Sequence, residues 1–243
     1  MRVNKGSAEA AMVARVPAID RLRGLAIVAM VAYHFCFDLR YFGVTQWDFY
    51  RDPFWLHART AILSSFLLIA GVSLVLANRH IDDRRFWRHV GTIGACAVAV
   101  SAASYAVFPQ SWIWFGVLHA IAISIVLVRP LVSHPRLALA VGALAIVVGN
   151  LFSHPAFDNR MLGWIGFMTA KPRTEDYVPL IPWTGVMLLG IALGHGLLRA
   201  RFRPVIVAEN LPRWMDWLGR HSLAVYMVHQ PLLLGGLYVT VGV

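Results

Sequence analysis

Long apolar runs alternate with short polar segments along almost the whole chain. The seven longest runs occupy residues 22–39, 58–77, 87–107, 112–130, 136–153, 180–198 and 217–239. A helix needs about 20 mostly apolar residues to cross a hydrocarbon layer of roughly 30 Å. The pattern therefore predicts an all-α, polytopic transmembrane bundle of about seven spanning helices. An eighth apolar stretch, residues 162–170, is too short to span, and we expect it to form a short interfacial or re-entrant helix.

Composition agrees with a membrane protein, because 58% of the residues are hydrophobic and only 14% are charged. The formal net charge of +10 first suggests a nucleic-acid partner. When the N-terminus is placed in the cytoplasm, however, most of the 22 Lys and Arg residues fall in cytoplasmic segments, as the positive-inside rule requires. The basic excess therefore indicates topology, and we expect the lipid bilayer as a partner and no nucleic acid.

The chain is expected to form one membrane domain with a short tail. Residues 1–15 are predicted to be a disordered cytoplasmic tail, and residues 16–243 a single transmembrane domain. The segment before Arg21 lacks the apolar core of a signal peptide, so we expect the first apolar run to be a retained helix.

Polar residues inside the first predicted helix call for a reason, because they cost free energy in a membrane. Arg23 and His34 are eleven positions apart, almost three helical turns, so they share one face with Asp20 below and Asp38 above. Asp38, at i+4 from His34, is placed to accept a proton from the imidazole and to fix its tautomer. The alternative is that Arg23 is only a membrane-surface anchor and His34 a packed, neutral side chain. Spacing alone leaves both interpretations open.

Three further histidines, His57, His119 and His229, fall in the predicted outer half of the bundle. A zinc site is not predicted, because no two of these histidines are three or four positions apart and the sequence has no HExxH or CxxC. Proton-coupled transport is disfavoured as well, because all acidic residues fall at predicted helix ends or in loops. The pattern therefore predicts that three or four imidazoles converge on the outer half of one bundle.

Several ordered motifs resemble a known family. They are Asp20-x-x-Arg23-Gly24 with His34 on the same helix, Phe115-Gly116-Val-Leu-His119, Pro179-Leu-Ile-Pro182-Trp183, and Leu218-Gly219 followed by Ser222-Leu, Tyr226 and His229-Gln-Pro. Together they resemble the heparan-alpha-glucosaminide N-acetyltransferase catalytic-domain family, particularly its compact bacterial members. The spacing from Arg23 to His34 is also similar to that of the membrane acyltransferase family 3.

The resemblance implies an enzyme of the inner membrane that moves an acyl group from cytoplasmic acetyl-CoA or another acyl-CoA, the co-substrate, to a sugar or related hydroxyl or amine acceptor on the periplasmic side. No metal is implied. His34 is then the expected general base, with Asp38 as its catalytic partner. The remaining residues are expected to bind substrate or to form structural motifs. The substrate-binding set is Arg23, His57, His119, Tyr226 and His229, and the structural set is Asp20, Gly24, Pro182 and Trp183.

Two other classes of function fit the same pattern. A transporter of small solutes or glycan lipids would use the histidines to line a polar path. A non-catalytic scaffold of the cell envelope would tolerate the loss of His34, His119 and His229 together.

Overall fold

The computed structural model describes residues 16–77 and 82–241, so the predicted tail, residues 1–15, lies outside the described residues. The described part is built of helices joined by turns and loops. These are α2 (Pro17–Tyr41), α3 (Pro53–Ala77), α4 (Asp83–Val107), α5 (Val117–Val128), α6 (Pro135–Leu151), α7 (Leu180–Arg199), α8 (Trp214–Arg220) and α9 (Ser222–Val241), with 3₁₀ turns η1 (Arg129–Leu131), η2 (Pro155–Phe157), η3 (Gly163–Ile165) and η4 (Arg203–Asn210). The prediction of an all-α protein is confirmed.

Five of the described helices, α2, α3, α4, α7 and α9, are long and apolar enough to cross a membrane. The helix α5, even when extended by η1, and the helix α6 are shorter apolar helices. The helix α5 is short because residues 112–116 are not helical, so it begins at Val117 and not at residue 112 as the hydrophobic run predicts. Its 12 residues reach only about 18 Å at 1.5 Å per residue.

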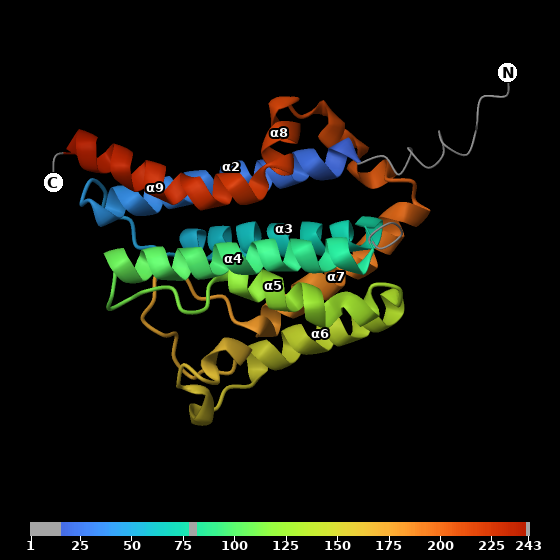
Figure 1. Cartoon of the computed structure of the whole chain (residues 1–243), viewed down its shortest axis with the longest axis horizontal. Helices are drawn as coiled ribbons and strands as arrows, with labels where there is room; N and C mark the ends of the chain where they lie inside the picture. Colours follow the sequence, from blue (N-terminus) through green and yellow to red (C-terminus); the bar gives the residue numbers. More distant parts are fainter. Residues whose placement is uncertain (1–15, 78–81, 242–243) are drawn as a thin grey trace, which may run out of the picture.

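The helices form stacked layers (Figure 1). One layer holds α2, α8 and α9, and α3 and α4 lie beside it, with α5, α6 and α7 beyond. Glycines allow close helix contacts between α3 and α7. A Cβ at Gly71 would collide with the Met187 carbonyl, and one at Gly190 would collide with the Leu68 carbonyl. Leu67, Met187 and Ile191 are fully buried at this crossing, which forms the centre of the largest hydrophobic core.

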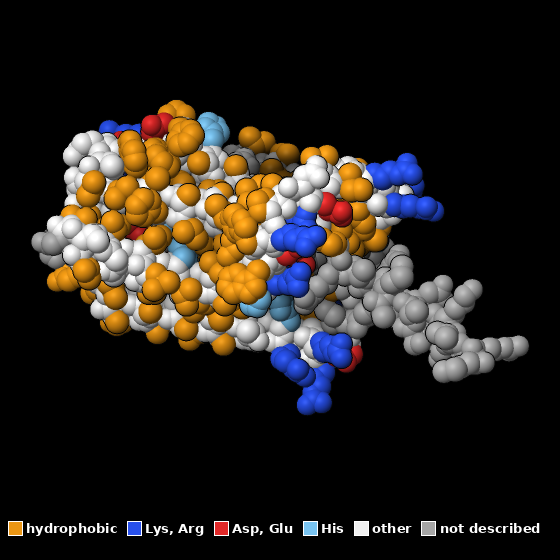
Figure 2. Space-filling view, turned by 90° about the horizontal axis from the view of Figure 1, so that it is seen from above, with side chains coloured by type: hydrophobic (Ala, Val, Ile, Leu, Met, Phe, Trp, Pro, Cys, Tyr) orange, Lys and Arg blue, Asp and Glu red, His pale blue; other side chains and the backbone are white. Residues whose placement is uncertain are grey.

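The bundle has two ends. The Tyr41 end is where α2 ends and α3 begins, and the Arg23 end is where α2 begins and α3 ends. In the space-filling view most Lys and Arg side chains gather toward the Arg23 end, and the rest of this face is mainly apolar (Figure 2). An apolar belt beside one basic end is the surface expected of a protein embedded in a membrane.

Two predicted helices differ in the structure. The run 217–239 is not one helix, because α8 ends at Arg220 and α9 begins at Ser222. Just before the break, the α8 backbone lies so close to α2 that a Cβ at Gly219 would collide with the Asp20 carbonyl. Within the stretch 162–170 the structure has only the 3₁₀ turn η3. This turn is followed by Gly166, whose φ of +119° suits only glycine and where a Cβ would collide with the Ile181 carbonyl. The expected interfacial or re-entrant helix is therefore wrong, and this segment is a loop.

Candidate active site

Two imidazoles, one from α2 and one from α9, meet inside the bundle. The ring centroids of His34 and His229 are 5.0 Å apart, with the ring planes at 63°. His229 is buried, and its Nδ1 lies 2.6 Å from the Tyr226 carbonyl oxygen. A carbonyl only accepts, so Nδ1 carries the hydrogen and Nε2 of the neutral ring is a lone-pair acceptor. That Nε2 is buried without a hydrogen-bond partner among the described residues. The pair therefore exposes an unused basic nitrogen to the interior of the site.

Aromatic side chains surround the imidazole pair. Tyr33 lies edge-on to His34 at 5.9 Å between centroids, and the Tyr226 ring is 5.5 Å from His229. Phe49, from the α2–α3 connection, is 2% exposed and contacts Tyr33 at 5.4 Å. A loop residue so deeply buried fixes this connection over the end of the site. The sequence shows aromatic residues in this loop, but their approach to His34 depends on how the loop folds back.

Asp38 does not hold His34 as predicted. Its Oδ1 accepts a 2.8 Å hydrogen bond from Nε2 of Gln230 on α9, and its Oδ2 has no partner among the described residues. The spacing i+4 puts both side chains on one face of α2, but the Asp38 carboxylate turns toward α9 and meets the amide there. The expected His34–Asp38 hydrogen bond is therefore wrong, and Asp38 instead connects α2 to α9 beside the imidazole pair. The His-Gln-Pro motif contains Gln230, but the sequence alone does not show which residue Gln230 bonds.

His119 and His57 lie apart from the pair. His119 is the third residue of α5, where its Nδ1 accepts a 3.3 Å hydrogen bond from the Gly116 N–H and its Nε2 lies 3.3 Å from the Ser101 hydroxyl. His57 is exposed in the first turn of α3, with its Nδ1 2.6 Å from the Pro53 carbonyl oxygen. Among the described residues, neither has a hydrogen bond or a ring contact with His34 or His229. The structure thus brings His34 and His229 together, while a role for His57 or His119 in binding substrate stays a prediction.

A residue that sequence reasoning missed, Asp176, caps the start of α5. Its Oδ2 accepts a 2.7 Å hydrogen bond from the Val117 N–H, and the neighbouring Tyr177 forms a parallel bridge with Phe115. Burial raises the pKa of Asp176, while the Val117 N–H and the nearby Lys171 and Arg59 offset part of that shift. Asp176 is also within electrostatic range of Tyr226 on α9. The loop before α7 thus reaches into the bundle toward the imidazole pair.

At the Arg23 end, the Asp20-x-x-Arg23-Gly24 motif packs helices together. Arg23 donates to Asp20 at 3.1 Å and to the Ser73 hydroxyl of α3 at 2.6 Å. A Cβ at Gly24 would collide with the Met215 carbonyl of α8. Through these contacts Arg23 connects α2 to α3, and its predicted role in binding the donor stays a prediction.

The predicted structural pair Pro182 and Trp183 lies in the first turn of α7. Trp183 packs against the two largest groups of buried apolar residues, and the next residue, Thr184, shares a 2.7 Å hydrogen bond with Ser124 of α5. Trp183 and Thr184 thus pack the start of α7 against the core and α5, while Pro182 lies close to Gly149 of α6. Within residues 16–77 and 82–241, no group of three His, Cys, Asp or Glu side chains is placed to hold a metal ion.

Comparison with known proteins identifies the family. The family model described as heparan-alpha-glucosaminide N-acetyltransferase, catalytic, matches residues 15–231. Searches among curated proteins and among solved structures find no match. The matched region includes both imidazoles, the Asp38–Gln230 hydrogen bond and the Asp20-x-x-Arg23-Gly24 motif. The chain therefore belongs to the heparan-alpha-glucosaminide N-acetyltransferase catalytic-domain family, a family of membrane acetyltransferases.

Proposed function

We propose that this protein transfers an acetyl group from acetyl-CoA to a hydroxyl or amine of a sugar or related acceptor, with His34 as the general base. The observation that carries the proposal is the His34–His229 pair, two imidazoles 5.0 Å apart within a chain of this acetyltransferase family. A neutral imidazole carries a lone-pair nitrogen that accepts a proton, as a general base must.

The reaction balances with one proton and one acetyl group. His34 accepts the proton of the acceptor O–H or N–H while that oxygen or nitrogen attacks the thioester carbonyl carbon. The carbon–sulfur bond then breaks, the acetyl group stays on the acceptor, and the CoA sulfur takes the proton from His34 to leave as a thiol. The neutral enzyme is restored.

His229 supports this step as a positioning residue. Two imidazolium charges this close repel each other strongly when water is excluded, so the pair holds one proton more readily than two. The free Nε2 of His229 therefore offers a hydrogen-bond acceptor to the acceptor substrate or to protonated His34.

We also propose the side of the membrane from which each substrate approaches. With the Arg23 end in the cytoplasm of a bacterial inner membrane, acetyl-CoA approaches from the basic side and the acceptor from the periplasmic Tyr41 end. The gathering of Lys and Arg toward the Arg23 end supports this orientation (Figure 2).

The test of the reaction class is made in proteoliposomes that contain the purified full chain. Acetyl-CoA labelled in the acetyl group is supplied with a panel of amino and neutral sugars, and both labelled sugar and free CoA thiol are measured. We expect the two products in equal amounts. Uptake of sugar with no CoA release would overturn the proposal and favour a transporter.

A further inference from the structure

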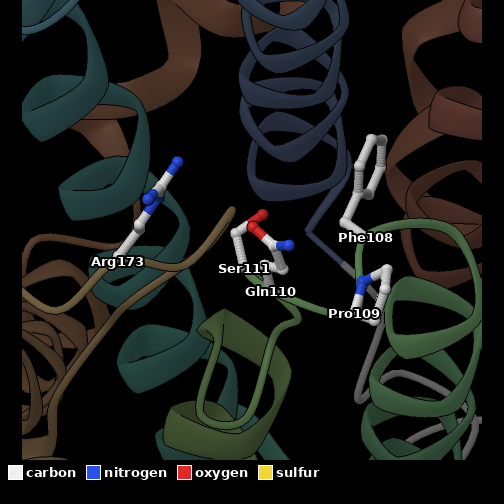
Figure 3. Close-up of a pocket in the computed structure, with 5 residues that line it drawn as sticks. All are labelled: Phe108, Pro109, Gln110, Ser111 and Arg173. Carbon is white, nitrogen blue, oxygen red and sulfur yellow. The ribbon is translucent and has the colours of Figure 1, made fainter.

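A cavity lies at the Tyr41 end, between the turn after α4 and the loop before α7. Its volume is ≈ 260 Å³, and it is lined by Phe108, Pro109, Gln110, Ser111 and Arg173 (Figure 3). Ligand pockets for whole cofactors and drug-sized molecules usually measure about 300–1,000 Å³. This cavity therefore suits one small polar group and not a complete acyl-CoA.

The walls of the cavity are tied to each other. The Glu175 N–H donates a 2.9 Å hydrogen bond to the Ser111 carbonyl, and the Ser111 hydroxyl donates to the Glu175 carboxylate. The Thr174 hydroxyl donates to the Trp112 carbonyl at 2.7 Å. These bonds fix the loop that carries Arg173 against the turn that forms the opposite wall, so the cavity is preformed.

The charge in the cavity is not neutralised within the described residues. Arg173 has no hydrogen bond or ion pair there, although Glu175 is only two residues away. The Glu175 carboxylate instead accepts a hydrogen bond from the Ser111 hydroxyl. Gln110 likewise has no described hydrogen-bond partner for its side-chain amide. Arg173 and Gln110 are both exposed and both line the cavity, and Arg173 lies across it from Phe108 and Pro109 (Figure 3).

We propose that this cavity binds an oxyanion, a phosphate or a carboxylate, held by Arg173 and Gln110. Guanidinium matches the paired oxygens of both groups, and hydrogen bonds between charged partners are about twice as strong as neutral ones. The oxyanion belongs either to a soluble polar molecule or to a lipid headgroup, and the experiment separates these sources. This inference is independent of acetyl transfer.

The first arm uses a soluble probe. Full-length protein in nanodiscs of phosphatidylcholine alone is titrated with glycerol 3-phosphate, and binding is followed by calorimetry. We expect Arg173→Gln to weaken binding about tenfold or more, and Arg173→Lys to weaken it less. Arg160→Gln is the matched control, because its loss changes the net charge equally. Arg160 does not line the cavity, and its guanidinium carbon lies 5.7 Å from the centroid of the Trp112 ring.

The second arm uses nanodiscs that contain both phosphatidylcholine and phosphatidylglycerol, and native mass spectrometry counts the retained lipids. Loss of bound phosphatidylglycerol in Arg173→Gln but not in Arg160→Gln assigns the site to a headgroup. If neither probe depends on Arg173 more than on Arg160, the oxyanion site is wrong. Binding is the readout in both arms, so failure of the acetyl-transfer proposal leaves this test intact, and the reverse also holds.

Discussion

Asp38 on α2 and Gln230 on α9 are joined by a 2.8 Å hydrogen bond that lies directly beside the imidazole pair. Gln230 follows His229 in the chain, and Asp38 is one helical turn beyond His34. Asp38 is 1% exposed, and Gln230 provides its one hydrogen bond among the described residues. The bond therefore holds together the two helices that carry His34 and His229.

Gln230→Ala is expected to leave a buried carboxylate without its partner. The free energy of unfolding in a fixed detergent should fall by about 1–3 kcal/mol, the usual cost of an unpaired buried polar group. Acetyl transfer should show a lower kcat with an almost unchanged KM for acetyl-CoA, because the change shifts His229 and not the donor. Asp38→Asn keeps an oxygen that can accept from Gln230 and serves as the milder control. If Gln230→Ala and the wild type have the same free energy of unfolding, the bond does not hold the two helices together.

Gly24→Ala tests the contact between α2 and α8. Its new Cβ would collide with the Met215 carbonyl, and forced overpacking typically costs about 1–3 kcal/mol. Gly94→Ala on α4 is the matched control, because a Cβ there meets no atom within 4 Å in the described part of the chain. We expect Gly24→Ala to lower the melting temperature, and Gly94→Ala to keep or raise it because alanine favours helix. Equal effects of the two substitutions would contradict the proposed close contact.

Asp176 makes stability depend on pH in a defined direction. Burial raises its pKa above the ordinary value of 3.8, so folding favours the protonated carboxyl. This contribution to stability is fully present below pH 3.8 and is lost as the pH rises through the raised pKa. Asp176→Asn stays neutral at every pH and still accepts from the Val117 N–H, so its melting temperature should fall less than that of the wild type on going from pH 4 to pH 8. A steeper fall for Asp176→Asn would reverse the assigned sign.

Much of the helical architecture follows from local hydrophobicity. The bounds of α2, α3, α4 and α7 lie within about five residues of the apolar runs, because a membrane helix satisfies its own backbone hydrogen bonds and needs only length and apolar side chains. The late start of α5 and the break between α8 and α9 were not predictable in this way. Both boundaries lie beside contacts across the fold, Asp176 with Val117 and Gly219 with Asp20, which local hydrophobicity does not reveal.

The candidate site was partly predictable for the same reason. Helical spacing and span direction place His34 and His229 in one half of the bundle, and the structure brings them together. Spacing does not give side-chain direction, so it wrongly predicted a hydrogen bond between Asp38 and His34. Nor does it show that His57 bonds within its own helix turn. Arg173 and Asp176 lie in a loop without periodicity, where the sequence holds no signal for their partners.

The most direct test of the central claim is the acetyl-transfer rate of His34→Ala at saturating acetyl-CoA, measured beside His57→Ala. Loss of a general base usually costs about 10²–10⁴-fold in rate. We predict a loss of at least about 100-fold for His34→Ala, with acetyl-CoA binding and melting temperature retained. His57 is exposed and bonded within its own helix turn, so His57→Ala should keep the wild-type rate. A wild-type rate in His34→Ala would contradict the assignment of His34 as the base.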